Sequence, residues 1–232
     1  MQLFAHRGIS DLAPENTMEA FKLALHQQCD GIELDVRLMS GTVVVMHDST
    51  VNRTTNGEGF VNQFTPLTWQ RLDAGDGQPP PSLRQVLELV RGVCVVNIEL
   101  KSGDLIHQVA NEIKHAVGQL NFEWVQLCVS AFDHRLLTEL KMLLPALNIA
   151  PLIASCPVSL AFLAHDMGAD ALHSYTETTD AQLVDDAHSR GLLVRVYTVK
   201  DAEELLRLKH LGIDAAFVND VAWARQVLNL SD

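Results

Sequence analysis

Short apolar stretches alternate with longer amphipathic ones along the whole chain. The short stretches are rich in β-branched residues and occur at 2–6, 31–36, 42–47, 93–100, 125–132, 148–154, 169–174, 192–199 and 214–218. Between them apolar residues recur with helical spacing, at 16–28, 82–91, 104–118, 133–144, 158–167, 179–190, 201–211 and 220–230. Strands that alternate with helices in this way predict a parallel sheet with helical crossovers.

One short connection identifies a surplus strand. Residues 38–41 are too few for a parallel crossover, so Ser40-Gly41 is expected to turn a β-hairpin whose second strand, 42–47, is an arm outside the main sheet. Without the arm, eight strands alternate with eight helices, which is the pattern of a (β/α)8 TIM barrel. We therefore predict an α/β protein with one barrel domain over residues 1–232. A doubly wound sheet is the alternative, but it has no reason to stop at eight units.

The segment 49–81 interrupts the alternation. It is rich in Thr, Asn, Gly, Gln and Pro, and it exceeds the about 2–6 residues of an ordinary connection from strand to helix. Long connections of this kind are commonly lids or binding loops. We expect an insertion after the second strand that lies over or beside the barrel mouth.

Composition and charge narrow the possible partners. The chain has 232 residues, 47% of them hydrophobic, so it can bury a full core. Its formal charge of −12, with no run of Lys or Arg, argues against nucleic acid as a partner and against stable membrane anchoring. The four cysteines, which form no C-x-x-C pair, are expected to be reduced core thiols. With no signal peptide pattern after Met1 and no long apolar stretch, a cytoplasmic location is expected if this start is the natural one.

Charged and imidazole side chains mark the ends of four strand-like stretches. A core strand has no packing reason to carry them, because each buried charge costs several kcal/mol unless it is paired or bound to a metal. In a barrel the carboxyl ends of successive strands meet at one mouth, so these side chains are expected to converge there. They are His6, Arg7, Glu33, Asp35, His47, Glu99 and Lys101.

This residue set predicts phosphoryl chemistry. Three converging carboxylates repel one another unless a positive charge lies among them, and oxygen ligands favour Mg²⁺ or Ca²⁺ over zinc. A buried ion network without a metal is the other interpretation, but two permanent cations against three carboxylates leave it underbalanced. An arginine holds phosphate oxygens bidentately, and histidines donate and accept protons near neutral pH. Metal-assisted cleavage of a phosphoester is therefore the predicted reaction.

An ordered set of motifs resembles the signature of the glycerophosphodiester phosphodiesterases. The resemblance is dense over residues 4–101 and thins to scattered matches beyond them, although the barrel pattern continues to the end. A single His-Arg-Gly would be a weak signal, whereas the ordered set is specific. Its members are His6-Arg7-Gly8, Pro14-Glu15-Asn16-Thr17, Glu33-x-Asp35, Val44-Val45-x-His47-Asp48, Arg53-Thr54-Thr55, Leu72-Asp73-Ala74-Gly75 and Asn97-Ile98-Glu99-Leu100-Lys101.

The resemblance implies hydrolysis of small-molecule glycerophosphodiesters to sn-glycerol 3-phosphate and an alcohol, with Mg²⁺ or Ca²⁺ as cofactor. It also implies a role for each matching position, with water or the substrate's own glycerol hydroxyl as nucleophile, the latter through a cyclic phosphate. The segment 49–81 resembles the family's insertion. The implied metal ligands are Glu33, Asp35 and Glu99, the acid/base pair is His47 (favoured as acid) and His6 (favoured as base), Arg7 contacts the phosphate, and Lys101 supports Glu99 or the phosphoryl oxygens.

Departures from the family pattern fall in the second half of the chain. Tyr197-Thr198-Val199-Lys200 stands where the family often has Trp-Thr-Val-Asn, so Tyr197 keeps an aromatic wall for the glycerol or alcohol group. The last strand, 215–220, lacks the usual Thr-Asp. These changes bear on substrate preference more than on the metal centre.

Two other functions and three further residues stay open. A lysophospholipase D or sphingomyelinase D-like enzyme would use the same site, but its substrates need an apolar channel and membrane access. A non-catalytic barrel that binds phosphodiesters is the second alternative, although none of the expected groups is missing. Glu15 is expected to pair with Arg7, Asp48 to orient His47 or cap a turn, and His173, at a strand end, is a weaker candidate for the mouth.

Overall fold

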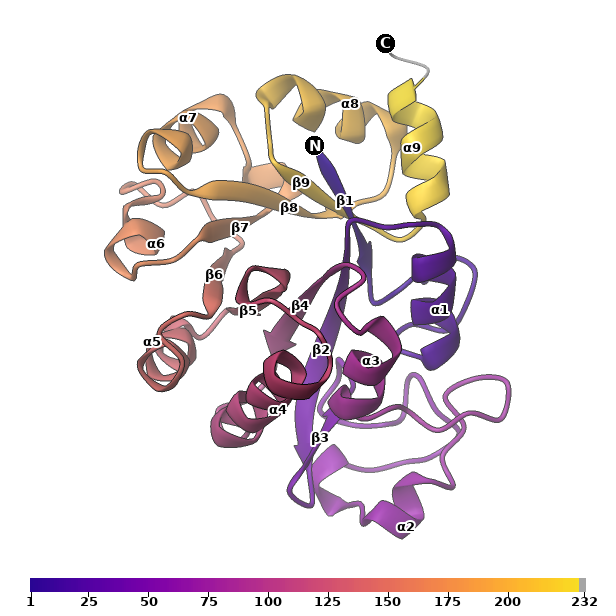
Figure 1. Cartoon of the computed structure of the whole chain (residues 1–232). Helices are drawn as coiled ribbons and strands as arrows, with labels where there is room; N and C mark the ends of the chain where they lie inside the picture. Colours follow the sequence, from indigo (N-terminus) through magenta and orange to yellow (C-terminus); the bar gives the residue numbers. More distant parts are fainter. Residues whose placement is uncertain (230–232) are drawn as a thin grey trace.

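Eight parallel strands form a closed ring in the computed structural model, which describes residues 1–229. Hydrogen-bonded pairing runs around the ring, and the first strand closes it by pairing with both the second and the last. Figure 1 looks into this ring. The strands in ring order are β1 (Gln2–His6), β2 (Gly31–Met39), β4 (Val95–Leu100), β5 (Leu127–Ala131), β6 (Asn148–Ile153), β7 (Ala171–Tyr175), β8 (Leu193–Val199) and β9 (Ala215–Val218). The prediction of a TIM barrel is confirmed.

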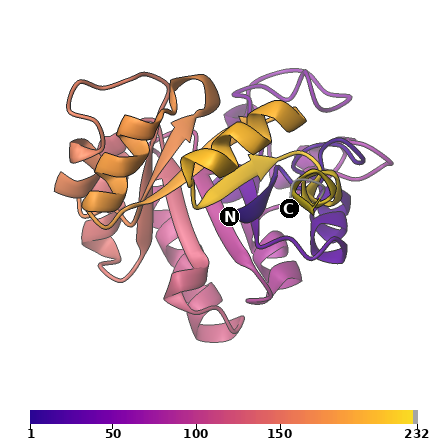
Figure 2. The same cartoon turned by 90° about the horizontal axis from the view of Figure 1, so that it is seen from above.

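Helices follow the strands and cover the outside of the ring (Figures 1 and 2). They are α1 (Met18–His26), α3 (Leu83–Val90), α4 (Ile106–Gln119), α5 (His134–Leu143), α6 (Phe162–Asp166), α7 (Ala181–Ser189), α8 (Ala202–Leu211) and α9 (Val221–Asn229). Several begin where the sequence provides a capping side chain: Ser82, Asp133, Asp180 and Asp201 each accept a hydrogen bond from a backbone N–H of the first turn. No helix within residues 1–229 is long and apolar enough to cross a membrane.

The hairpin arm is present as expected. Strand β3 (Thr42–Val45) runs antiparallel to β2, with Val45 opposite Val36 and Thr42 opposite Met39. It pairs with no other strand of the ring, so it lies outside the barrel. The arm extends β2 beyond the ring and carries His47 back towards the barrel mouth.

The insertion, residues 49–81, lies beside the barrel and not over its mouth (Figure 1). It contains a short 3-10 helix, Val61–Gln63, and the short helix α2 (Pro66–Trp69). Its apolar side chains form a second small core against the arm. The Trp69 indole N–H donates to the carbonyl of Pro80 at 2.9 Å and closes the segment on itself. The members of this core are Met39, Val44, Met46, Val51, Val61, Trp69 and Leu72.

Side chains from neighbouring strands fill the barrel interior next to β1. Phe4 and Phe217 meet edge to face with ring centroids 5.3 Å apart, an arrangement that aromatic quadrupoles favour. Gly31 faces Phe4 so closely that a Cβ atom there would lie 2.3 Å from the ring. The cysteines behave only partly as expected, because Cys29, Cys94 and Cys128 are buried whereas Cys156 is exposed. The prediction of a core thiol is therefore wrong for Cys156, which follows the end of β6 in a loop.

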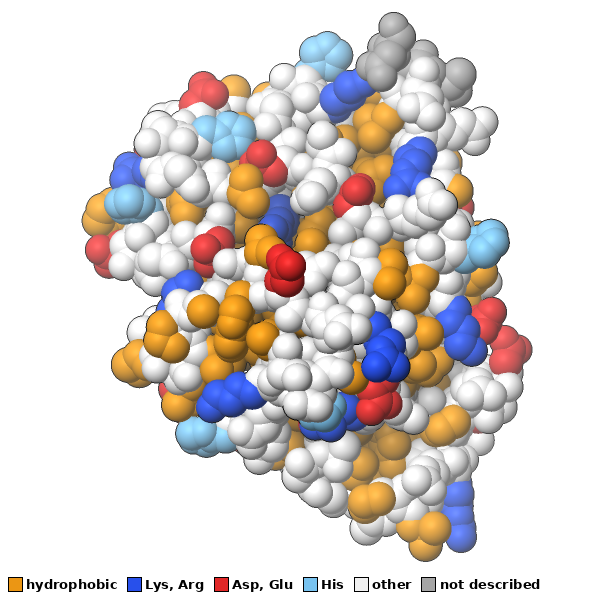
Figure 3. All heavy atoms as spheres, viewed as in Figure 1, with side chains coloured by type: hydrophobic (Ala, Val, Ile, Leu, Met, Phe, Trp, Pro, Cys, Tyr) orange, Lys and Arg blue, Asp and Glu red, His pale blue; other side chains and the backbone are white. Residues whose placement is uncertain are grey.

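Charged side chains are mixed on the face of the molecule seen in Figure 3. Lys and Arg are scattered there among acidic and apolar side chains, and the described residues of this face form no continuous basic patch. The interspersed charges fit the chain's net charge of −12.

Candidate active site

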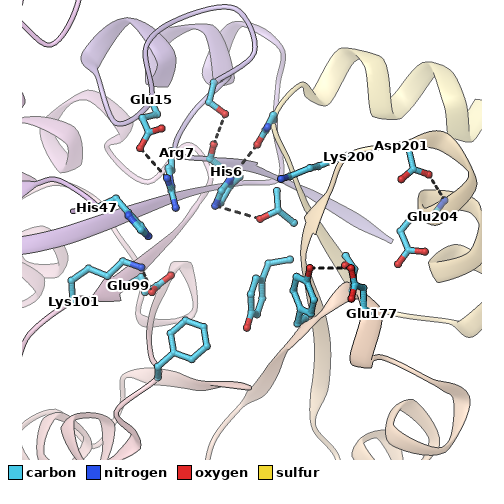
Figure 4. Close-up of a pocket in the computed structure, with 17 residues that line it drawn as sticks. His6, Arg7, Glu15, His47, Glu99, Lys101, Glu177, Lys200, Asp201 and Glu204 are labelled. Atoms are coloured by element: carbon cyan, nitrogen blue, oxygen red, sulfur yellow. Dashed lines mark hydrogen bonds and ion pairs between the residues drawn. The ribbon is translucent and has the colours of Figure 1, made fainter. Parts of the chain in front are cut away.

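The expected site residues converge at the carboxyl ends of the strands. His6 lies opposite Glu33 in the pairing of β1 with β2, and Asp35 lies opposite Glu99 in the pairing of β2 with β4. The two-residue spacing of Glu33 and Asp35 puts both side chains on one face of β2. Side chains at the ends of β1, β4 and other strands, and from the arm, surround a cavity of about 770 Å³, here called the mouth cavity (Figure 4). The expected residues that line it are His6, Arg7, His47, Glu99, Lys101 and Tyr197.

The three carboxylates form one cluster, of which Glu99 lines the mouth cavity whereas Glu33 and Asp35 are buried. Glu33, Asp35 and Glu99 each offer an oxygen atom, and these atoms all lie within 4.8 Å of one another. Burial and the neighbouring Asp35 charge raise the pKa of both Glu33 and Glu99. One oxygen of Glu33, Oε1, is buried without a hydrogen-bond partner. A cluster of oxygens with an unpaired buried acceptor suits a hard divalent cation.

Two cations offset part of this negative charge. Arg7 Nε lies 3.1 Å from Asp35 Oδ2, and Lys101 Nζ lies 3.0 Å from Asp35 Oδ1 and also contacts Glu99. Burial alone would raise the pKa of Asp35, but Lys101 and Arg7 bring it below its usual value. Arg7 has a left-handed backbone conformation, with φ of 58°, and its N–H donates to Glu33 Oε2 at 2.9 Å. The turn after β1 therefore binds the cluster with both backbone and side chain.

Asn16 takes part in the cluster, which the sequence did not indicate. It stands at the start of the helical pattern over 16–28, but Thr17 caps α1 by accepting from the N–H of Ala20. Asn16 instead has a left-handed backbone conformation and donates from Nδ2 to Asp35 Oδ2 at 2.9 Å. Both residue types are common N-caps, so the composition of the turn alone did not distinguish them.

His6 is held in one orientation by the last strand. Its Nδ1 lies 3.1 Å from Oδ1 of Asn219, which follows β9. An amide oxygen only accepts, so with this amide orientation Nδ1 carries the proton and Nε2 is left with its lone pair. Nε2 lies 3.9 Å from Glu33 Oε2 and 3.5 Å from the hydroxyl of Thr198. Burial, together with the Arg7 charge, lowers the pKa of His6 to about 4, which favours a neutral ring.

His47 is held by its neighbours on the arm. Its Nδ1 lies 2.7 Å from Asp48 Oδ1, so Asp48 orients the ring, one of the two roles expected for it. Its carbonyl accepts two hydrogen bonds from the Arg37 guanidinium, at 2.9 and 2.8 Å. Burial lowers the pKa of His47, although the Asp35 and Asp48 carboxylates oppose this.

A chain of ion pairs connects Arg7, after β1, with Asp48, next to His47 on the arm. The Arg7 guanidinium binds Glu15 at 2.9 Å, which confirms the expected pair. Arg53 of the insertion donates to both oxygens of Glu15 at 2.8 Å and to Asp48 at 2.6 Å. Arg53 is half-exposed, but its planar fork matches two carboxylates at once. The insertion therefore contributes to the site by positioning these groups from the side.

His173 does not reach the mouth cavity. It is completely buried beneath the site, its ring 5.1 Å from that of Phe217, and burial lowers its pKa well below the usual value. Neither ring nitrogen has a hydrogen-bond partner. It lines a small cavity of about 20 Å³ with Glu33 and Asn97, and with His6, Glu99 and Tyr197, which also line the mouth cavity. The candidate role at the mouth is therefore wrong for His173.

The closed barrel, with its polar cluster at the carboxyl ends of the strands, places the chain among the (β/α)8-barrel enzymes. Comparison with protein families then gives a more specific assignment. The model of the glycerophosphoryl diester phosphodiesterase family matches residues 6–222. The chain belongs to this family, as its motifs predicted, and it is a phosphodiesterase.

Known relatives and structures agree with the assignment. The chain is 37% identical to a glycerophosphodiester phosphodiesterase of Caldanaerobacter subterraneus subsp. tengcongensis, over 94% of this chain and 93% of the relative. A glycerophosphodiester phosphodiesterase of Bacillus altitudinis is 31% identical, over 94% of each chain. Among solved structures, an Oleispira antarctica phosphodiesterase in complex with the product sn-glycerol-3-phosphate matches with a TM-score of 0.90 and 27% identity. That match covers 99% of this chain and 97% of the other.

Proposed function

We propose that this chain hydrolyses glycerophosphodiesters to sn-glycerol 3-phosphate and an alcohol, using a divalent cation and the His6 and His47 pair. The observation that supports this most is a cluster of three carboxylates, one of which, Glu99, lines a cavity of about 770 Å³ together with two imidazoles and two cations. The names of the relatives and the product bound to the Oleispira antarctica enzyme point to the same substrate class.

Glu33, Asp35 and Glu99 would hold the cation. Their oxygens are the ligands that Mg²⁺ and Ca²⁺ prefer, and the unpartnered buried Glu33 Oε1 is an acceptor that a cation would satisfy. When bound, such a cation supplies Lewis acidity towards a phosphoryl oxygen and offsets the repulsion within the cluster. Arg7 and Lys101 line the mouth cavity beside the carboxylates and would bind the remaining phosphoryl oxygens.

The two histidines would divide the proton transfers. His6, whose Nδ1–H donates to the side-chain oxygen of Asn219, keeps Nε2 free to accept a proton from the attacking hydroxyl. That hydroxyl belongs either to water or to the substrate's glycerol, the latter giving a cyclic phosphate first. His47, whose Nδ1 lies against Asp48, would give a proton to the leaving alcohol from Nε2. Tyr197 would form a wall for the organic part of the substrate.

Coupled detection of glycerol 3-phosphate across a panel of glycerophosphodiesters tests the proposal. Release should stop with excess EDTA and return with Mg²⁺ or Ca²⁺. His6→Ala and His47→Ala should each lower kcat by at least ~10²-fold, a typical loss for an acid/base group. Release that continues in excess EDTA would contradict the role of the cation. Faster choline release from lysophosphatidylcholine than from glycerophosphocholine would favour the lipid-cleaving alternative, and no release at all would favour the non-catalytic one.

A further inference from the structure

We propose that the half of the mouth cavity away from the carboxylate cluster is a subsite for a cationic alcohol group. Glycerophosphodiesters that release choline or ethanolamine would then be preferred over those that release glycerol or another neutral alcohol. This preference rests on the phosphodiesterase function proposed above. It specifies the alcohol group of the substrate, which the sequence did not determine.

Three aromatic rings form one wall of this half. Phe132 follows β5, Tyr175 ends β7 and Tyr197 lies in β8, and all three line the mouth cavity. The Tyr197 ring centroid is 6.0 Å from each of the other two, with interplanar angles of 87° to Phe132 and 50° to Tyr175. Rings tilted against one another in this way present their edges and faces around a shared space. Aromatic faces attract cations within about 6 Å of the ring centroid.

The aromatic wall is anchored by Tyr197, while Phe132 leaves much of its surface exposed. The Tyr197 hydroxyl donates to the carbonyl of Ile153 at 2.9 Å, which fixes this ring against β6. Phe132 is 51% exposed although it lines a cavity. An exposed aromatic side chain contributes little to the core, so its surface is available to a ligand.

A carboxylate stands beside the rings. Glu177 lines the same half, is exposed and accepts a hydrogen bond from the Tyr175 hydroxyl at 3.3 Å. Its charge raises the pKa of Tyr175, a sign of negative potential at this wall. Two other carboxylates line the cavity nearby but have structural partners: Glu204 pairs with Arg207, and Asp201 caps α8. Glu177 is therefore the carboxylate available to a cationic ligand.

Positive charge lies at the other end of the mouth cavity. Arg7 and Lys101 are on the side of the carboxylate cluster, and in Figure 4 the amine of Lys200 points towards His6 and away from Glu177. The cavity thus has cations where a phosphate would bind, and aromatic rings with a carboxylate where the alcohol would lie. A phosphodiester of a cationic alcohol carries its charges in the complementary order. The volume, about 770 Å³, is within the about 300–1,000 Å³ of small-molecule sites.

The test compares kcat/KM for glycerophosphocholine and glycerophosphoglycerol with the full chain loaded with Mg²⁺. We expect about a tenfold preference for glycerophosphocholine, in line with a partly desolvated cation–π contact. Glu177→Gln, which keeps the shape and removes the charge, and Phe132→Leu, which removes an aromatic face, should each reduce this preference. Both should lower kcat/KM for glycerophosphocholine more than for glycerophosphoglycerol, and the remaining glycerophosphoglycerol hydrolysis shows that the variants fold. The matched control is Glu203→Gln, an exposed carboxylate of α8 outside the cavity lining.

A binding measurement gives an independent readout. Choline should inhibit glycerophosphoglycerol hydrolysis more strongly than its neutral carbon isostere, in which a tert-butyl group replaces the trimethylammonium group, and Glu177→Gln should narrow that difference. Equal kcat/KM for the two substrates, or an equal loss of both in Glu177→Gln, would overturn the cationic subsite while leaving the phosphodiesterase function standing. Release of glycerol 3-phosphate from neither substrate would overturn the phosphodiesterase function itself, and the subsite with it.

Discussion

His6 Nδ1 lies 3.1 Å from the side-chain oxygen of Asn219, across the seam where the first and last strands of the barrel meet. A neutral amide holds the imidazole here without adding negative charge next to it. The ring is fixed in orientation, while its pKa stays low, at about 4, because burial and Arg7 both disfavour the charged form. Closure of the barrel thus sets the orientation of a proposed catalytic base.

Asn219→Asp should move the acid limb of the pH profile of kcat/KM to higher pH. A carboxylate next to the ring favours imidazolium, so the pKa of His6 would rise and the base would be protonated at pH values where it is now free. The profile measures the shift directly. Asn111→Asp, on the exposed side of α4, is the control and should leave the profile unchanged. A profile of Asn219→Asp that matches the wild type would mean that His6 is not the base.

Glu33→Gln and His47→Gln should separate metal binding from proton transfer. Loss of a carboxylate from the cluster removes a ligand oxygen charge, so calorimetric titration should show Mg²⁺ affinity lowered by more than about tenfold in Glu33→Gln. His47→Gln should bind the metal as the wild type does and still lose about 10²-fold in kcat. Glu88→Gln, exposed on α3, is the control. Unchanged affinity in Glu33→Gln would exclude it as a ligand.

Arg53→Ala should lower kcat by about tenfold, which is a smaller decrease than substitution of His47 itself would cause. The variant removes the hydrogen bond from Arg53 to Asp48, so Asp48 holds the His47 ring less firmly. Arg71→Ala, an exposed arginine of the same insertion, should leave kcat unchanged. Full activity of Arg53→Ala would mean that Asp48 orients His47 without help from the insertion.

The ion pair between Arg53 and Asp48 should also affect the stability of the fold in acid. Arg53 and His47 lower the pKa of Asp48 to about 2 in the folded chain. A depressed carboxyl pKa stabilises the fold at pH values above the unfolded pKa, and this contribution is lost as pH falls towards 2. Urea unfolding of wild type and Arg53→Ala should therefore differ at pH 6 and converge at about pH 2. A constant difference across that range would show that Arg53 stabilises the fold by packing and not through Asp48.

Gly31→Ala should destabilise the barrel by about 1–3 kcal/mol, because the added Cβ would lie 2.3 Å from the buried Phe4 ring and the interior is closely packed. Gly118→Ala, in α4 with open space around it, should instead raise stability by about 0.5–1 kcal/mol through helix propensity. Free energies of unfolding in denaturant measure both. Equal effects of the two substitutions on the free energy of unfolding would mean that the Phe4 ring moves aside and accommodates the added Cβ atom.

The insertion and α1 show where sequence patterns lost their predictive value. Composition marked 49–81 as an insertion, but its position beside the barrel follows from Trp69 and its neighbours packing on the arm. Asn16 and Thr17 are adjacent and both are common N-cap residue types, but Thr17 caps α1 while Asn16 donates to the buried Asp35 carboxylate. In both cases the deciding contact involves residues far away in the chain.

By itself, the sequence determined the eight alternating units, the arm and the carboxylate cluster, because strand periodicity and short connections leave few ways to bring Glu33, Asp35 and Glu99 together. Only the tertiary structure decided which partners complete the site. Asn219 lies 213 positions from His6, and Arg53 lies 38 positions from Glu15. The aromatic wall likewise depends on ring closure, which places Phe132, Tyr175 and Tyr197 around one space. The periodicity of the strands determines which side chains reach the mouth cavity. Packing and the pairing of buried polar groups determine which contacts these side chains make with one another.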